Sequence, residues 1–269
     1  MSGSIKMWCS KSSILIHDFG QAHDGSIECL KIDTNSHYFY SGGSAGKLKK
    51  WDSKKKVLVT CYGQAHGGAT ILSIAICREW MFTADGVGRL KCWAVGPDSH
   101  HLGSSPLMAV NLALFSLNCH KDFGPVHSGG VEAMAITNNG QWLFTTDHNG
   151  FLKQWAISET PRLYKNYGNV MCGAISAIAV TNCDRFLFVT NEEGDMRKFD
   201  IGKGEFVKFY EKIMENWIYG LCVAPQGDRM WMTDNEGFMK CWDIGTEETV
   251  KDYKKVGSGG VHSLNFISC

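Results

Sequence analysis

The sequence repeats one short pattern, in which a glycine stands five residues before a tryptophan or phenylalanine. The closing aromatics are Trp8, Trp51, Trp93, Trp155, Phe199 and Trp242, and their glycines are Gly3, Gly46, Gly88, Gly150, Gly194 and Gly237. Successive aromatics are separated by 43, 42, 62, 44 and 43 residues. A regular period of this length indicates a repeat architecture, in which one supersecondary unit is stacked many times.

Each period contains four segments typical of short β-strands. The first alternates apolar residues and occurs at Ile27–Ile32, Ile71–Ile76, Val131–Ile136, Ile175–Val180 and Ile218–Val223. It is followed by a turn, an aromatic second strand, a polar turn with the repeated glycine, a third strand and a more variable fourth strand. No segment of useful length has helical periodicity, so we predict an all-β chain built from antiparallel meanders.

A four-stranded meander cannot bury both faces of its sheet alone, but radial stacking of about 4–8 such sheets buries them. Trp51-Asp52 and Trp242-Asp243 carry a Trp-Asp ending, and Ala22-His23, Ala65-His66 and Val126-His127 precede first strands. In these features the chain resembles the WD-repeat β-propeller family over nearly all its length. The resemblance implies a single domain over residues 1–269 with about six four-stranded antiparallel blades. Five of these would be complete, and one would be split between the termini.

Two parts of the chain depart from this regular plan. The third interval is longer by about 20 residues, which predicts an insertion over 97–125 within the second full repeat. Within it, MAVNLALFSL is expected to be an extended fourth strand. By residue count the split blade lacks its second strand. Three explanations compete: the chain belongs to a longer propeller, a partner segment fills the gap, or the blade has only three strands. We favour the first alternative, because an unpaired strand edge promotes aggregation.

A further departure concerns a hydrogen-bond network of the family. The resemblance implies a buried network of Asp, His, Ser or Thr, and Trp, with the aspartate directly before the repeated glycine. Those positions hold Ala45, Val87, Asn149, Glu193 and Glu236, and aspartate stands two residues earlier at Asp85, Asp147 and Asp234. We therefore expect the network to be absent in its usual form.

Charge and cysteine content limit the function classes. Lysine plus arginine equals aspartate plus glutamate at 27 each, which disfavours nucleic acid or an anionic membrane as the general partner. No apolar run is long enough to span a bilayer. The eleven cysteines form no CxxC pair, so free thiols in a reducing compartment are expected, and we assign the chain to the cytoplasm.

The polar turns before the third strands define the candidate site. All of them are expected on one rim, where they would form a partial acidic ring with an aromatic anchor. Its predicted protein-binding residues are Asp85, Asp147, His148, Glu192, Glu193, Asp234, Glu236 and Trp217. Such a rim fits a basic peptide. Alternatively, these short side chains only satisfy the backbone of their turns.

No catalytic, phosphate-binding or metal motif of recognised spacing occurs. We therefore predict a non-enzymatic interaction scaffold, without cofactor or metal, that presents the rim to other proteins within a larger assembly. The alternative is a propeller hydrolase that uses a metal and channel carboxylates.

Overall fold

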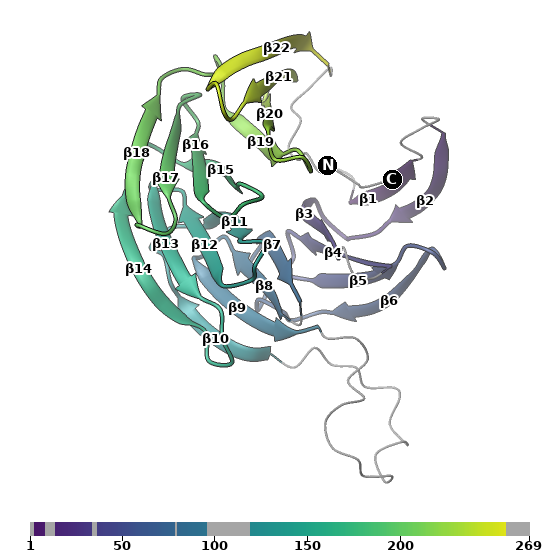
Figure 1. The fold of residues 1–269 in the computed structure, drawn as a ribbon. Helices are drawn as coiled ribbons and strands as arrows, with labels where there is room; N and C mark the ends of the chain where they lie inside the picture. The colour runs from purple at the N-terminus through teal and green to yellow at the C-terminus, as the bar shows by residue number, and fades with distance from the viewer. Residues whose placement is uncertain (1–2, 9–13, 34–36, 79, 96–118, 257–269) are drawn as a thin grey trace. The chain divides into compact units, whose positions relative to one another are not determined.

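The structure is a computed structural model that describes residues 3–8, 14–33, 37–78, 80–95 and 119–256. Every regular element within these ranges is a β-strand (Figure 1). The chain divides into two compact units, Met1–Val131 and Glu132–Cys269. Each unit is described by itself, and the assignment of one domain to residues 1–269 stays a prediction. The all-β prediction is confirmed.

The first unit contains one two-stranded and two four-stranded antiparallel sheets. The two-stranded sheet pairs β1 (Ser4–Trp8) with β2 (Leu15–Gln21). The next sheet contains, in spatial order, β3 (Ile27–Ile32), β4 (Tyr38–Gly43), β5 (Leu48–Asp52) and β6 (Val57–Tyr62). The third contains β7 (Ile71–Cys77), β8 (Trp80–Asp85), β9 (Arg89–Ala94) and β10 (Cys119–Pro125).

The second unit contains three four-stranded antiparallel sheets, each in simple meander order. The first is β11 (Val131–Ile136), β12 (Trp142–Asp147), β13 (Phe151–Ala156) and β14 (Arg162–Asn169). The second is β15 (Ile175–Val180), β16 (Phe186–Asn191), β17 (Met196–Asp200) and β18 (Glu205–Tyr210). The third is β19 (Ile218–Val223), β20 (Arg229–Asp234), β21 (Phe238–Asp243) and β22 (Glu248–Lys255). The five four-stranded blades of the predicted propeller class are thus confirmed.

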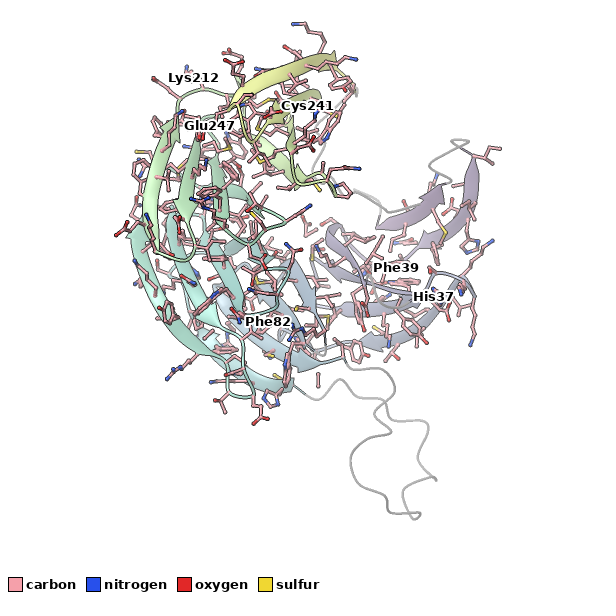
Figure 2. The ribbon with its side chains drawn as sticks, viewed as in Figure 1. His37, Phe39, Phe82, Lys212, Cys241 and Glu247 are labelled. Atoms are coloured by element: carbon pink, nitrogen blue, oxygen red, sulfur yellow. The ribbon has the colours of Figure 1, made fainter. Side chains whose placement is uncertain are left out.

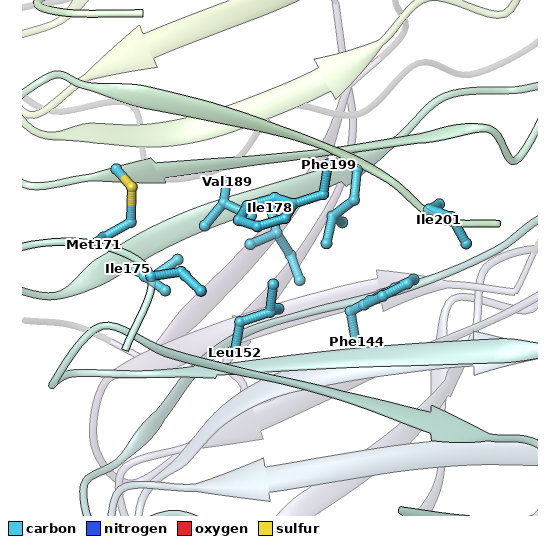
Figure 3. Packing of buried hydrophobic residues seen from close by; sticks show 10 residues of the cluster. Phe144, Leu152, Met171, Ile175, Ile178, Val189, Phe199 and Ile201 are labelled. Atoms are coloured by element: carbon cyan, nitrogen blue, oxygen red, sulfur yellow. The ribbon is translucent and has the colours of Figure 1, made fainter. Parts of the chain in front are cut away.

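Within each unit the core lies between successive sheets. In the second unit, Phe144 and Leu152 of one sheet pack with Ile175, Val189 and Phe199 of the next (Figure 3). All five side chains are buried. Because strand side chains alternate between faces, each sheet uses one face for each neighbour. This stacking of meanders is how propeller blades bury both their faces.

The repeated glycine is required by the backbone. Gly150 has φ 82°, in the left-handed region that favours glycine. A Cβ atom there would collide with the carbonyl oxygen of Met171. Gly88 and Gly194 have the same positive φ, and in each case an added Cβ would meet a carbonyl of the loop before the next first strand. The repeated glycines therefore stand where two loops approach each other closely.

The fourth strand of the third sheet lies inside the segment predicted as an insertion. β10 pairs with β9 and completes that sheet, so residues 119–125 are part of the repeat, and the predicted insertion over 97–125 must end before Cys119. MAVNLALFSL, the segment predicted as this strand, lies outside the described residues. Residues 257–269, on which the prediction of the split blade depends, lie outside them as well.

Candidate functional site

The aspartates of the polar turns are buried. Asp85, Asp147 and Asp234 are exposed to 0%, 1% and 2%. Each folds back onto its own turn: Asp85 Oδ1 accepts hydrogen bonds from the backbone N–H of Val87 at 3.0 Å and of Arg89 at 2.9 Å. Asp147 and Asp234 accept the equivalent pairs in their turns at 2.8–3.0 Å. These carboxylates satisfy turn backbone groups, as the alternative interpretation of the sequence held.

One sheet contains the complete network that the sequence appeared to lack. His66 lies 2.7 Å through Nδ1 from Asp85 Oδ2 and 2.7 Å through Nε2 from Thr83 Oγ1. Trp93 Nε1 donates to the same Thr83 hydroxyl at 2.7 Å. Burial alone would raise the pKa of Asp85, but His66 and the turn N–H groups outweigh it and lower that pKa. The prediction that the network is absent is therefore wrong here, because the displaced aspartate still reaches the histidine.

Other sheets contain altered versions of this network. In the β3–β6 sheet, Ser41 Oγ accepts from Trp51 Nε1 at 2.8 Å and lies 2.7 Å from His23 Nε2. Gly43 stands at the aspartate position there, so His23 has no counterpart of the Asp85 hydrogen bond among the described residues. Burial and the nearby Lys49 lower the pKa of His23 to about 4, so this imidazole is neutral at pH 7. In the second unit, Asp234 accepts from Asn216 Nδ2 at 3.2 Å where other sheets use histidine.

The predicted acidic ring is therefore much reduced. Asp85, Asp147 and Asp234 have structural roles, because buried carboxylates that hold their own turns cannot present charge to a partner. Glu193 and Glu236 are exposed, and Glu192 is half-buried. The side chain of His148 is 63% exposed, and Trp217 is 39% exposed. These five residues are at least partly accessible to solvent, and their role in binding stays a prediction.

Several of the remaining groups come together within the second unit. The rings of Trp217 and Tyr219 lie 5.6 Å apart, and the Trp217 carbonyl accepts from the N–H of Asn235 in the turn that carries Glu236. Burial raises the pKa of Tyr219, and the carboxylates of Glu132 and Glu192 raise it further. We name Glu132, His148, Glu192, Trp217 and Tyr219 the rim cluster.

Sequence reasoning missed two members of the rim cluster. Glu132 on β11 is not among the residues predicted for the rim, yet its Oε1 lies 3.6 Å from Nδ1 of His148. Burial raises the pKa of Glu132. Tyr219 stands two residues after Trp217, and that strand spacing was the signal that could have placed both rings on one side. The cluster thus combines two carboxylates with two aromatic rings.

Most of the repeated lysines before the closing aromatics are held by the sheets. Lys49 and Lys240 donate to the carbonyls of Ala22 and Ile213 at 2.6 and 2.7 Å. Lys6 and Lys91 lie 3.7 and 3.4 Å from carboxylate oxygens of Asp18 and Asp122 on the fourth strands. These lysines therefore have a structural role, because their ammonium groups have fixed partners.

The part of the chain that the structure describes contains neither a metal-ligand cluster nor a membrane-spanning helix. In that part of the chain, no three His, Cys, Asp or Glu side chains converge as a set of metal ligands. Nor does it contain a helix with the length and apolar character of a membrane span.

Comparison with known proteins identifies the repeats. The family model for the WD domain, G-beta repeat, matches residues 14–52 and 116–156. Each match begins near the fourth strand of one sheet and ends with the third strand of the next. The second match, for example, begins near β10 and ends with β13. A search of curated proteins finds no match.

Proposed function

From its two matched repeats and its five four-stranded blades, which support membership of the WD-repeat β-propeller family, we infer that this chain is a non-enzymatic protein-interaction scaffold. Proteins of this fold generally bind other proteins. We propose further that the rim cluster binds a basic segment of a partner within a larger assembly.

The observation that carries this proposal is the pairing of Trp217 with the carboxylates around Tyr219. A lysine or arginine side chain is attracted both to carboxylates and to the face of an aromatic ring. Trp217 is the more exposed member of the ring pair, and the charges of Glu132 and Glu192 act on Tyr219. An aromatic anchor beside opposite charge is typical of residues that dominate binding energy at interfaces.

The alternative of a metal-dependent hydrolase receives less support. The turn aspartates Asp85, Asp147 and Asp234 each use one carboxylate oxygen to accept hydrogen bonds from the backbone of their own turn. Asp85, which lies 2.7 Å from an imidazole nitrogen of His66, belongs to a network that ends on the indole of Trp93. That arrangement joins the strands of a sheet, which favours a structural role for this carboxylate.

A peptide titration tests the proposal. The probe is a fluorescein-labelled peptide of four Lys-Ala repeats, followed by fluorescence anisotropy at low and high salt. We expect salt-dependent binding that weakens about fivefold in Glu132→Gln/Glu192→Gln and in Trp217→Ala, as expected for exposed ion pairs and a cation–π contact. Glu205→Gln/Glu248→Gln, which removes two exposed outer-strand carboxylates, is the control. Equal loss in the control, or no loss in the rim variants, would refute a rim-specific site.

We also propose a reducing cytoplasmic location for this scaffold. The nine cysteines among the described residues are all free thiols, which supports the proposal. Fractionation of cells that express a tagged chain tests it, and recovery in a secreted fraction would contradict it.

A further inference from the structure

The β15–β18 sheet breaks a pairing that four of the other five sheets maintain; in the β3–β6 sheet Lys49 faces Cys61 and donates instead to the Ala22 carbonyl. A lysine on the third strand faces an acidic or amide residue on the fourth, in pairs that include Lys6 with Asp18, Lys91 with Asp122, Lys153 with Asn166 and Lys240 with Asp252. In the β15–β18 sheet the corresponding residues are Arg197 and Phe209. The cation has changed type, and its polar partner has been replaced by a phenyl ring.

Arg197 consequently lacks the partner that its counterparts have. Its guanidinium carbon lies 5.6 Å from the ring centre of Phe206 and 5.3 Å from that of Phe209. Its Nε is buried and has no hydrogen-bond acceptor among the described residues. No carboxylate in that part of the chain lies within ion-pair distance of it, in contrast to Lys6 and Lys91. A donor left in this state is costly, which makes an acceptor from outside favourable.

The rings beside Arg197 are open to solvent. Phe206 is 53% exposed and Phe209 is 42% exposed, although both belong to a class of residue that is normally buried. The β17–β18 register shifts between Lys198 and Phe199, so β18 carries one extra residue, Val207. This bulge places both phenylalanines on the side of Arg197.

The strand that carries these rings is also the edge of its sheet. Among the described residues, β18 pairs only with β17, so its outer backbone groups are available to another strand. An extended peptide can add to such an edge through main-chain hydrogen bonds, and its alternate side chains then meet the side chains of the edge strand. Arg197, Phe206 and Phe209 therefore form one surface, which we name the β18 patch.

We propose that the β18 patch docks an extended acidic segment of a partner protein. A guanidinium is suited to a carboxylate because it can donate two parallel hydrogen bonds to it. A carboxylate of the partner would take the position beside Arg197 that an aspartate of the fourth strand holds in other repeats. Phe206 and Phe209 provide apolar area on both sides of that contact. The patch selects a partner of opposite charge to the one that the rim cluster would select, and it contains none of the rim-cluster residues.

The test uses a labelled peptide of four Glu-Val repeats, with a Gln-Val peptide of the same length as the uncharged comparison. Fluorescence anisotropy should show that the wild type binds the acidic peptide at least about tenfold more tightly than the neutral one, or ~1.4 kcal/mol. Phe209→Asp restores the repeat's own acid opposite Arg197 and should abolish this preference, as should Arg197→Gln. Val250→Asp adds a carboxylate to an equally exposed outer-strand position on β22 and should leave it unchanged.

Thermal unfolding of each variant separates loss of binding from loss of fold, and Phe209→Asp should remain folded because Arg197 gains a partner. The proposal is overturned if the wild type binds neither peptide or binds both equally. It is also overturned if Phe209→Asp keeps the preference. Binding of phosphatidylserine vesicles that depends on Arg197, without binding of the acidic peptide, would assign the patch to a membrane surface instead.

Discussion

Replacing Glu247 by glutamine should destabilise the contact between the last two sheets of the second unit. Glu247 lies in the turn between β21 and β22 (Figure 2). Its Oε1 accepts from Lys198 Nζ on β17 at 2.7 Å, and its Oε2 accepts from Lys208 Nζ on β18. The side chain of Lys198 is only 9% exposed, and that of Lys208 is 51% exposed. The buried ammonium of Lys198 therefore depends on this single carboxylate.

The magnitude follows from the burial of the pair. Removing one partner of a fully buried ion pair costs about 3–5 kcal/mol. Glu247 retains 21% exposure, and a glutamine carbonyl can still accept from Lys198, so we expect a loss of about 2 kcal/mol. Lys198 also lies 4.1 Å from the ring centre of Phe186, which stabilises the ammonium in both proteins.

The pKa of Glu247 gives this prediction a pH dependence. Burial alone would raise that pKa, but the hydrogen bonds from Lys198 and Lys208 outweigh it and lower the pKa from 4.5 to about 2. A carboxyl whose pKa is lowered by folding stabilises the protein fully above its unfolded pKa, and the contribution is lost as pH falls toward the folded pKa. Wild type should therefore lose stability between about pH 5 and pH 2, and Glu247→Gln should lose less over that range.

Urea unfolding at pH 7 and pH 3 measures both effects. Glu248→Gln, a change of the adjacent exposed glutamate, is the matched control and should have wild-type stability. The free-energy difference between wild type and Glu247→Gln should be about 2 kcal/mol at pH 7 and clearly smaller at pH 3. A difference below about 0.5 kcal/mol at pH 7, the usual range for surface substitutions, would refute the reasoning. So would a difference that does not change with pH.

Two further substitutions test the architecture by urea or thermal unfolding. Thr83→Val should cost about 2–4 kcal/mol, because it leaves the Trp93 N–H and an imidazole nitrogen without their shared partner, and adding Trp93→Phe should recover part of that loss. If the double variant is as unstable as the sum of its single variants, the two residues are not coupled through this bond. Gly150→Ala should cost more than the roughly 1–3 kcal/mol of its φ alone, because the new Cβ meets a carbonyl oxygen. Gly68 also has a positive φ, 91°, but an added Cβ there would meet open space. If Gly68→Ala lost as much stability as Gly150→Ala, the clash could not be the cause of the larger loss.

The strands were predictable because apolar alternation and turn residues act locally. The predicted first strands Ile27–Ile32, Val131–Ile136, Ile175–Val180 and Ile218–Val223 coincide with β3, β11, β15 and β19, and Ile71–Ile76 is one residue shorter than β7. Here binary pattern and turn chemistry agree, and that agreement specifies a meander. The fourth strand β10 was not found, because its polar sequence CHKDFGP lacks the apolar alternation of the first strands.

The candidate site was only partly predictable, because a sequence does not show which way a turn carboxylate points. Asp147 in TTDHNG can extend into water or bend back onto the N–H groups of Asn149 and Phe151, and only the turn geometry decides between them. Glu132 is brought to His148 by strand pairing across the sheet. Neither relation appears in residue spacing.

In a repeat protein, each repeat can be compared with the others at the same position. Where one repeat has a different residue, the surrounding structure compensates for the change at some positions and not at others. Gly43 replaces the network aspartate, and an added Cβ there would lie 2.6 Å from Nδ1 of His23, so the missing acid leaves space for the ring. Val189 stands where the network threonine would be in the β15–β18 sheet. The closing aromatic of that sheet is Phe199, whose ring has no N–H that needs an acceptor. Arg197 is different, because its lost acid is replaced by exposed Phe209 and its Nε keeps no acceptor among the described residues. A departure that costs stability without compensation is expected where function maintains it, and this reasoning favours the β18 patch over the other altered positions.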